Sequence, residues 1–406
     1  MLYCIFVMVQ CFYCIIVFSN MKLFFTLVLL SIYLTVVSQW KIEASFPGEK
    51  RDDAVAFVAD GFGYVGTGMN TWYSCTNDFY RYDVSSADWR RIADLPAQPR
   101  QYAAAVGSGG FGYVLGGVNG AGQELKDYWS YRATEDRWVE KANFPGTARS
   151  KALLLATDKQ LFLFGGRGGA NALNDCWVYN PEGDSWRQLN TMPFGGRFDL
   201  VGFYQFGSIY LGLGTDTAKN SYSDWWRFDP GHEIWVQMQD FPGESVTYNV
   251  ALAGSVRNFV SAGSKGNYQF AADSWEYSVV NNSWHSFPVP DAHSFRGSAG
   301  FVLDNRFYLA CGLDSTFNRL NTLWSVRFET PQADYLVYPN PSSEKVVIYV
   351  AENQQDNTEI QVFDYLGRNV QILKGVNYPY VLDVSGWPTG TYLIKTGKFQ
   401  QKLIRP

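Results

Sequence analysis

Short apolar stretches alternate with glycine-rich turns along most of this chain. In one representative unit, apolar stretches at 152–156 and 160–164 run into the pair Gly165–Gly166. A segment at 174–179 follows, in which aromatic residues alternate with others, and a polar turn then leads to Trp186. Short runs of this kind, bounded by turn residues, are typical of β-strands. The unit therefore predicts four short strands, the last of which begins at the tryptophan.

The closing tryptophan of each unit returns at an almost constant interval. Its positions are 49, 49, 48, 49 and 49 residues apart: Trp40, Trp89, Trp138, Trp186, Trp235 and Trp284. A period near fifty indicates one supersecondary unit copied along the chain. Paired glycines or their near equivalents follow the second predicted strand of each unit, for example at Gly116–Gly117.

Two series of charged residues recur with the same period as the tryptophans. An arginine follows the tryptophan by 11 residues in the first four units and by 12 in the last: Arg51, Arg100, Arg149, Arg197 and Arg296, with Val246 in the fifth place. An aspartate begins the third strand of five units: Asp78, Asp127, Asp175, Asp224 and Asp273, with Thr322 in the sixth. A guanidinium at the same position in each unit is well suited to bind backbone carbonyls or an acidic partner in the next unit. We predict that both series are structural.

These paired glycines, aromatic pairs and closing tryptophans resemble the kelch repeat, from Trp40 to about Phe328. The resemblance implies that each unit is a four-stranded blade of a β-propeller. A single blade cannot bury both of its faces, whereas a closed ring of blades buries them and protects the strand edges. Because Trp40 has no third strand ahead of it and the sixth unit lacks a final tryptophan, we predict that residues 40–44 complete the sixth blade.

The pattern changes after residue 330. Strand-like segments follow at 345–350, 359–364, 369–373, 381–385 and 389–395, and about seven short strands in roughly 70 residues predict a small β-sandwich. The Pro-Asn-Pro opening at 339–341, the turn at 363–368 and the run at 383–392 resemble the C-terminal sorting domain of the type IX secretion system. The resemblance implies passage across the outer membrane, followed by removal of the domain or anchoring at the cell surface. An ordinary terminal adhesion module is the alternative.

The predicted fold class is all-β, a six-bladed kelch β-propeller followed by a small β-sandwich sorting domain. The first 38 residues contain a single charge, at Lys22, and small residues at 36–38 suit a signal peptidase. Residues 1–20 are then an extension upstream of the true start at Met21. An uncleaved anchor formed by residues 2–18 and 23–37 is the alternative. The predicted domains are a signal peptide at 1–38, the propeller at 39–330, a linker at 331–337 and the sorting domain at 338–406.

Composition narrows the range of functions. Charged residues make up 17% of the chain, the formal charge is −5 and no basic run is present, which argues against nucleic-acid binding. Beyond the leader, the cysteines Cys75, Cys176 and Cys311 lie in different units, so a disulfide framework is not expected. His232, His285 and His293 are the only histidines, and no pair has metal-ligand spacing. The ligand set of the kelch copper oxidases cannot be assembled from a recognisable motif, and we predict no metal and no cofactor.

The kelch resemblance indicates where a site would lie. Side chains two positions after the repeat arginine line the central opening in such propellers, as do those just after the glycine pair. The first set is Asp53, Tyr102, Lys151, Asp199 and Tyr248, with Ser298 in the last blade. The second set is Asn119, Arg167, Asp216, Lys265 and Asp314. Together they predict a shallow bowl of mixed charge and aromatic rings, which suits a sugar or a peptide; solvated loop residues without a specific role are the alternative.

Three functions remain open from the sequence. The favoured one is a secreted or cell-surface propeller that binds a glycan or an extracellular protein. The second is an enzyme on the same fold, a sugar isomerase or mutarotase of the sialic-acid type, in which carboxylates of the bowl act as acid and base. The third is a purely structural envelope protein. A deep pocket with two close carboxylates or a buried histidine would favour the enzyme, and a broad aromatic shelf would favour binding.

Overall fold

The computed structural model describes residues 40–244, 247–254, 258–261, 263–264, 269–271, 273–279, 282–288, 293–327, 335–338, 345–350 and 359–406. The predicted signal peptide and Lys265 lie outside these residues. Within them the elements are strands, apart from one 3-10 turn at Ala133–Glu135 (η1). No described segment forms a helix long and apolar enough to span a membrane. The prediction of an all-β chain is confirmed.

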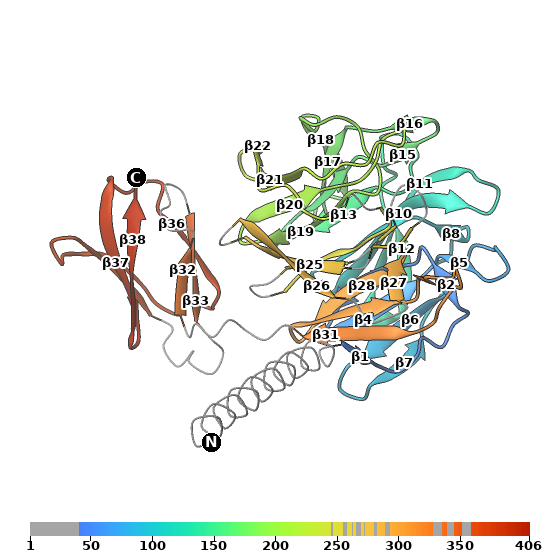
Figure 1. The fold of residues 1–406 in the computed structure, drawn as a ribbon, viewed down its shortest axis with the longest axis horizontal. Helices are drawn as coiled ribbons and strands as arrows, with labels where there is room; N and C mark the ends of the chain where they lie inside the picture. The colour runs from blue at the N-terminus through green and yellow to red at the C-terminus, as the bar shows by residue number, and fades with distance from the viewer. Residues whose placement is uncertain are drawn as a thin grey trace, which may run out of the picture.

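Four-stranded antiparallel sheets follow one another around a ring (Figure 1). The first two sheets pair, in order, β3 (Val55–Ala59), β4 (Phe62–Gly66), β6 (Phe79–Asp83) and β7 (Asp88–Arg91), and then β9 (Ala104–Ser108), β10 (Phe111–Asn119), β11 (Glu124–Arg132) and β12 (Arg137–Glu140). The third and fourth sheets pair β13 (Leu153–Ala156), β14 (Leu161–Phe164), β17 (Cys176–Asn180) and β18 (Ser185–Gln188), and then β19 (Val201–Gln205), β20 (Ser208–Gly212), β21 (Trp225–Asp229) and β22 (Ile234–Gln237). The fifth and sixth sheets pair β23 (Ala251–Ala253), β24 (Asn258–Val260), β25 (Asp273–Ser278) and β26 (Ser283–Pro288), and then β28 (Ala299–Leu303), β29 (Arg306–Ala310), β31 (Leu323–Arg327) and β1 (Trp40–Ile42).

The ring closes through the sixth sheet. Strand β1 pairs with β31, placing Trp40 opposite Val326. The first strands of the sheets contact one another in turn, and β28 contacts β3, so the circle is complete. These strands surround a central channel of about 390 Å³ whose lining is mostly alanine, valine and leucine. The predicted completion of the sixth blade by the strand at Trp40 is confirmed.

Aromatic side chains fill the space between neighbouring sheets. Between the first two sheets, Phe57 packs on Trp138 with ring centroids 6.3 Å apart. Several repeat tryptophans also donate an indole hydrogen bond to a carbonyl 45 residues earlier, as Trp89 does to Ala44 and Trp138 does to Ala93. A fully buried aromatic core of this kind stabilises the ring mainly through removal of apolar surface from water. The tryptophan period therefore marks the contact between each sheet and its predecessor.

Short two-stranded ribbons lie at one edge of the sheets, where the segment before the first strand meets the loop after the second. These pairs are β2 (Arg51–Asp52) with β5 (Met69–Asn70), β8 (Arg100–Gln101) with the end of β10, β15 (Arg167–Gly168) with β16 (Asn171–Ala172), and β27 (His293–Arg296) with β30 (Leu313–Asp314). Both kinds of loop therefore share one face of the ring. This loop-bearing face carries the site described below.

The second glycine of each pair allows this close meeting. Gly117 has a φ of 98°, and a Cβ there would come within 2.7 Å of the Gln101 carbonyl oxygen. Only glycine combines that conformation with that approach. The first position of the pair is less demanding, because Thr67 and Cys311 occupy it with φ values of 56° and 63°. Cys176 and Cys311 are buried free cysteines.

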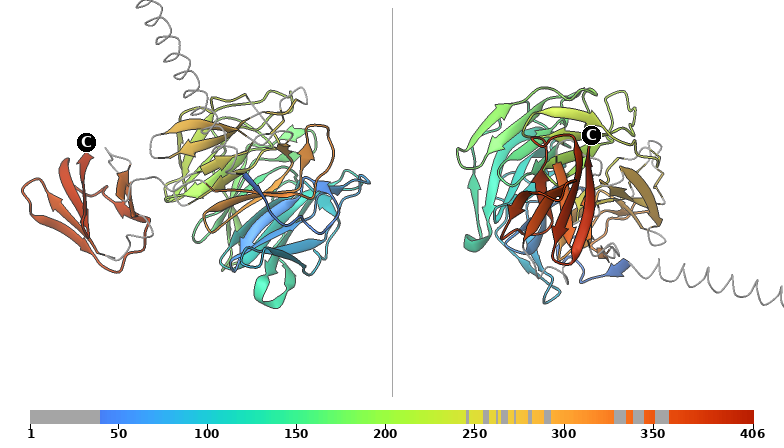
Figure 2. Two further views of the ribbon diagram at one scale, coloured as in Figure 1. Left: turned by 60° about the horizontal axis from the view of Figure 1, so that its bottom comes forward. Right: turned by 90° about the vertical axis from the view of Figure 1, so that its left-hand side faces the viewer.

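The C-terminal strands form a second body, drawn in red in Figures 1 and 2. Two sheets face each other around an apolar core that includes Ile348 and Ile394. One sheet pairs β32 (Tyr335–Tyr338), β33 (Lys345–Val350) and β36 (Tyr380–Asp383), and the other pairs β35 (Asn369–Leu373), β34 (Ile360–Asp364), β37 (Gly390–Thr396) and β38 (Phe399–Arg405). Strand β32 begins at Tyr335, ahead of the boundary predicted at residue 338. The predicted small β domain is confirmed.

Candidate functional site

The segments that precede the first strands converge on the mouth of the central channel. Each contains one residue in the left-handed region: Asp53 at 56°, Tyr102 at 55°, Lys151 at 56°, Asp199 at 56°, Tyr248 at 59° and Gly297 at 64°. For a residue other than glycine this conformation costs roughly 1 kcal/mol. Its recurrence in every repeat means that something specific in the ring compensates for the cost.

The compensation is a circle of backbone hydrogen bonds between repeats. In five of the six repeats, the left-handed turn points the amide at the carbonyl of the equivalent residue one repeat earlier. The donor–acceptor pairs are Asp53 to Gly297 at 2.8 Å, Tyr102 to Asp53 at 3.3 Å, Lys151 to Tyr102 at 2.9 Å, Asp199 to Lys151 at 3.1 Å and Gly297 to Tyr248 at 2.9 Å. These bonds fix where each side chain enters the mouth of the channel.

The side chains enclose a cavity of about 150 Å³ at that mouth. The structure brings together all five residues of the first predicted set, with Ser298. The backbone equivalent in the sixth repeat is Gly297, because Arg296 stands one residue later in its repeat than the other arginines do. The Ser298 hydroxyl donates to the Cys311 carbonyl at 3.2 Å and still lines the cavity.

Lys151 occupies the middle of this group. Its ammonium lies 3.0 Å from the Asp199 carboxylate, and both side chains are buried. It also lies 3.9 Å from the ring centroid of Tyr248 and 4.5 Å from that of Tyr102, distances at which a cation is attracted to the ring face. Burial alone would lower the pKa of Lys151, but Asp199 and Tyr248 raise it above its ordinary value. The lysine therefore stays charged and holds the two rings and the carboxylate together.

Asp53 is the second carboxyl of the cavity, and its environment differs. Burial and the neighbouring charge of Asp52 raise its pKa to about 7, although Lys151, Arg296 and a hydrogen bond from Tyr102 act in the opposite direction. The pKa of Tyr102 is raised far above its ordinary value, first by burial and second by the charge of Asp53. Near neutral pH, Asp53 can therefore exchange a proton, whereas Tyr102 remains a hydrogen-bond donor.

Asn249 lines the same cavity and was not among the predicted residues. It is 9% exposed, and among the residues that the structure describes neither its amide nitrogen nor its amide oxygen has a hydrogen-bond partner. A buried amide left without partners costs about 1–3 kcal/mol for each unpaired group, so such groups call for an explanation. The sequence carries a signal for it: the residue after the left-handed position is Ala54, Ala103, Ala152 and Leu200 in the first four repeats, and the amide interrupts this apolar series.

The second predicted set has a different role. Asn119, Asp216 and Asp314 each begin a five-residue turn after the second strand, where the side-chain oxygen accepts backbone amides within the turn, for example from Gln123, Asn220 and Asn318. Arg167 is exposed and donates to the Gly169 carbonyl. None of these four residues lines the cavity, and Lys265 lies outside the described residues. Asx side chains in such places are committed to turn formation.

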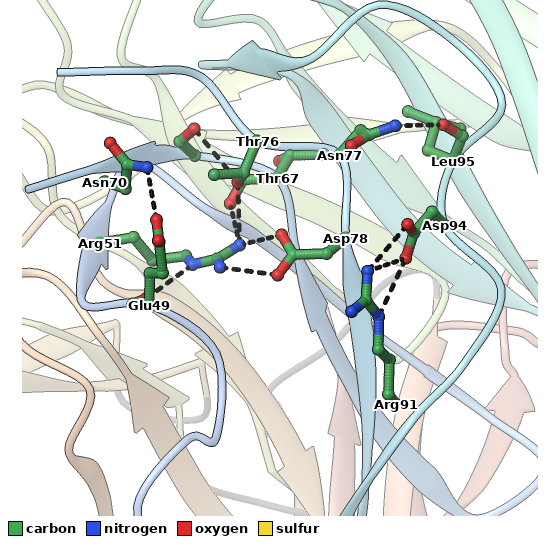
Figure 3. Close-up of polar contacts among 11 residues, drawn as sticks. Glu49, Arg51, Thr67, Asn70, Thr76, Asn77, Asp78, Arg91, Asp94 and Leu95 are labelled. Carbon is green, nitrogen blue, oxygen red and sulfur yellow. Dashed lines mark hydrogen bonds and ion pairs between the residues drawn. The ribbon is translucent and has the colours of Figure 1, made fainter. Parts of the chain in front are cut away.

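The repeat arginines form buried ion pairs with the repeat aspartates (Figure 3). The Arg51 guanidinium contacts both oxygens of Asp78, at 2.6 and 2.9 Å, and donates to the Thr67 carbonyl at 3.0 Å. Arg100, Arg149 and Arg197 pair in the same way with Asp127, Asp175 and Asp224. The prediction of a structural role is supported, but an acidic partner in the next blade is wrong for these four. Each pair lies within one repeat. The arginine precedes the first strand and the aspartate lies at or near the start of the third, and both of these strands pair with the second strand of the same sheet.

The comparisons with known proteins agree with this architecture. A family model described as the KLHDC2/KLHL20/DRC7 Kelch-repeats domain matches residues 96–248, and one described as the secretion system C-terminal sorting domain matches residues 336–405. The chain carries both kelch repeats and a sorting domain. It is also similar to Kelch-like protein 34 of Homo sapiens, at 28% identity over 90 residues, which cover 21% of this chain and 13% of that protein. Kelch repeats indicate an interaction module, and the sorting domain indicates export by type IX secretion.

Proposed function

We propose that this exported propeller is a binding module, secreted or held at the cell surface, that holds a glycan or an extracellular protein at its central cavity. The observation that carries the proposal is that Asn249, whose side-chain amide has no hydrogen-bond partner among the described residues, lines the cavity together with Asp53 and Lys151. An amide offers donors and an acceptor, and the carboxyl and phenol add more. A sugar, whose hydroxyl groups both donate and accept, is the ligand that this set of groups suits best.

A glycan array tests the proposal with the purified protein. We expect binding to a defined set of glycans, and we expect Asn249→Ala to weaken it at least about tenfold because one strong polar contact is worth roughly that much. The matched control is Gln101→Ala: the Gln101 side-chain oxygen also lacks a partner, but the residue does not line the cavity. Equal loss in the two variants, or no glycan binding at all, contradicts a sugar site in the cavity.

One observation favours catalysis as a second candidate. Asp53 and Asp199 share the cavity, and the pKa of Asp53 is raised to about 7 while Asp199 is paired with Lys151. Two carboxyls in unlike environments are the arrangement that acid–base chemistry on a sugar needs. Nuclear magnetic resonance of any bound sugar would show faster anomeric exchange in the presence of enzyme, lost in Asp53→Asn. Unchanged exchange leaves binding as the function.

A further inference from the structure

The turns after the second strands share a backbone conformation at one position but carry different side chains there. In sheets one, two, four and six the fourth residue of the turn has a positive φ: Tyr73 at 58°, Gly122 at 77°, Lys219 at 66° and Phe317 at 66°. Glycine is the residue that adopts this conformation without strain, and a bulky side chain there is unusual. Sheets one and six nevertheless carry aromatic rings at this place, and Tyr73 is 76% and Phe317 50% exposed. Burial of these rings in the fold does not explain them.

The rings of these two turns form an arc across adjacent sheets. Trp72 precedes Tyr73 and is 78% exposed. Phe317 lies 5.0 Å from Phe270 of the fifth repeat, measured between ring centroids. The Tyr73 ring lies 4.6 Å from the Arg319 guanidinium of the sixth repeat. We use the term aromatic arc for the described residues Trp72, Tyr73, Phe317 and Phe270.

The turns hold the arc rigidly. In the first sheet, the Asn70 side-chain oxygen accepts the amides of Trp72 and Ser74, both at 3.0 Å. Arg319, beneath Tyr73, is fixed by the Asp52 carboxylate at 2.6 Å. Strained residues persist where the surrounding structure over-determines them, and they cluster at functional sites. Because the backbone of the turn is already ordered, a ligand that stacks on these rings loses little further backbone freedom in the protein.

Side-chain contacts link the arc to the residues of the central cavity. Asp52 bonds Arg319 on one side, and Arg296 lies 3.8 Å from its other carboxylate oxygen. The Arg296 guanidinium in turn lies 4.1 Å from the ring centroid of Tyr248, which lines the cavity. A chain of contacts therefore leads from the cavity across Asp52 to Tyr73.

We propose that the aromatic arc binds the outer sugar units of an oligosaccharide whose end unit sits in the cavity; this proposal rests on the proposed function. The C–H face of a sugar ring packs on the electron-rich face of an aromatic ring, while its hydroxyl edges remain in water. Threonine, serine and asparagine surround Trp72 and Tyr73 in the turn, so each ring is a single apolar face with a polar frame. Aromatic rings are also enriched at protein interfaces, so a protein partner is an outcome that the test below distinguishes. The low charge of the chain gives no basis for a charged polymer.

The test compares ligand length with ring removal in the full protein. Oligosaccharides from single sugars to long chains, built on the glycan that the array identifies, are titrated by calorimetry. We expect affinity to rise about tenfold or more with length, and we expect Trp72→Ala and Tyr73→Gly to abolish that gain while leaving binding of the shortest ligand unchanged. Lys219→Gly, at the same turn position in sheet four, is the matched control and should change neither. Tyr73→Gly removes a strained conformation, so its melting temperature should equal or exceed that of the unaltered protein.

The outcomes separate this inference from the proposed function. A gain with length that survives in both ring variants overturns the arc and leaves the cavity as the sugar site. Affinity that is lost equally for short and long ligands in Trp72→Ala also overturns it, because the ring would then act on the cavity. Absence of glycan binding in the unaltered protein overturns both proposals. Binding of a protein that needs Trp72, with no glycan bound, assigns the arc to protein recognition instead.

Discussion

At the scale of single residues, the repeat separates positions that the ring requires from positions that it leaves open. Gly117 is required because its conformation and its approach to the Gln101 carbonyl exclude any side chain. The left-handed residue of each repeat is constrained only in its backbone, whose amide and carbonyl serve the circle of hydrogen bonds. Its side chain is free to differ, and it is aspartate, tyrosine or lysine in different repeats. Diversity at a constrained backbone position is how this scaffold assembles a particular cavity.

Asp53 gives a prediction at this scale. Its folded pKa, about 7, lies above the ordinary 3.8, so between these values the folded protein keeps a proton that the unfolded chain releases. Stability from this group is therefore full at low pH and falls as pH rises toward 7, by at most about 1.4 kcal/mol per pH unit. Asp53→Asn removes the decline, and asparagine tolerates the left-handed backbone. Chemical denaturation from pH 4 to 8 should show that the free energy of unfolding of the variant increases relative to that of the unaltered protein as pH rises.

Asp216 serves as a control because its pKa is shifted in the opposite direction from that of Asp53. Hydrogen bonds from Asn220 and Tyr222 hold the pKa of this exposed turn carboxylate below its ordinary value, against a smaller effect of burial. Its contribution is present above the unfolded pKa and is lost as pH falls through the folded pKa. Asp216→Asn should therefore change stability mainly by removing a contribution that grows from acid toward neutral pH. A parallel pH response in the two variants would contradict the assignment of Asp53 as a buried, proton-holding carboxyl.

At the scale of elements, each of the first four sheets is held at its edge by an arginine that spans two loops. Arg51 is 0% exposed at its side chain, and its donors reach the Thr67 carbonyl and the Asp78 carboxylate. Burial would raise the pKa of Asp78, but hydrogen bonds and charge from Arg51 overcome this and lower it. The pair therefore stays ionised. It fixes the segment before the first strand against the start of the third, and this is what brings the left-handed residue to the channel mouth.

Loss of this pair should be costly. Asp78→Asn leaves the buried Arg51 charge without its partner, and we expect a loss of about 3 kcal/mol in the free energy of unfolding. The matched control is Asp94→Asn, which breaks the exposed Arg91–Asp94 pair shown beside it in Figure 3, with side-chain exposures of 61% and 41%. That change should cost no more than about 1 kcal/mol. Urea denaturation measures both, and similar losses in the two variants would refute the distinction between edge pair and surface pair.

At the scale of the whole molecule, closure joins residues almost 300 positions apart. Strand β1 supplies the fourth strand of the sheet formed by β28, β29 and β31, so the two ends of the repeat region share one sheet. Trp40 is 8% exposed and packs on Phe259 and Trp324, with ring centroids 6.0 and 6.4 Å away. Each sheet buries its faces only against its neighbours, so an open ring would leave two apolar faces in water.

Trp40 therefore tests closure. Trp40→Ala should lower the free energy of unfolding by about 3–5 kcal/mol, as expected when a large buried aromatic is truncated. Lys41→Ala, on the adjacent exposed position of the same strand, should be close to neutral. Thermal unfolding followed by circular dichroism and tryptophan fluorescence checks both. A Trp40→Ala protein with an unchanged melting curve would mean that closure does not contribute to the cooperative unit.

The sequence by itself determined the repeat, its four strands, the closing strand and the small C-terminal β domain. The strands follow from local periodicity and from glycine positions that act through backbone conformation within one unit, whereas the tryptophans act through burial between neighbouring sheets. The kelch resemblance also indicated that Asp53, Tyr102, Lys151, Asp199 and Tyr248 lie at the central opening, and these residues line the cavity. Only the tertiary structure decided which polar side chains face a shared space. Asn119, Asp216 and Asp314 form their own turns, whereas Asn249 lines the cavity and the rings of Trp72 and Tyr73 are exposed. That difference depends on contacts between repeats, and such contacts exist only once the ring is closed.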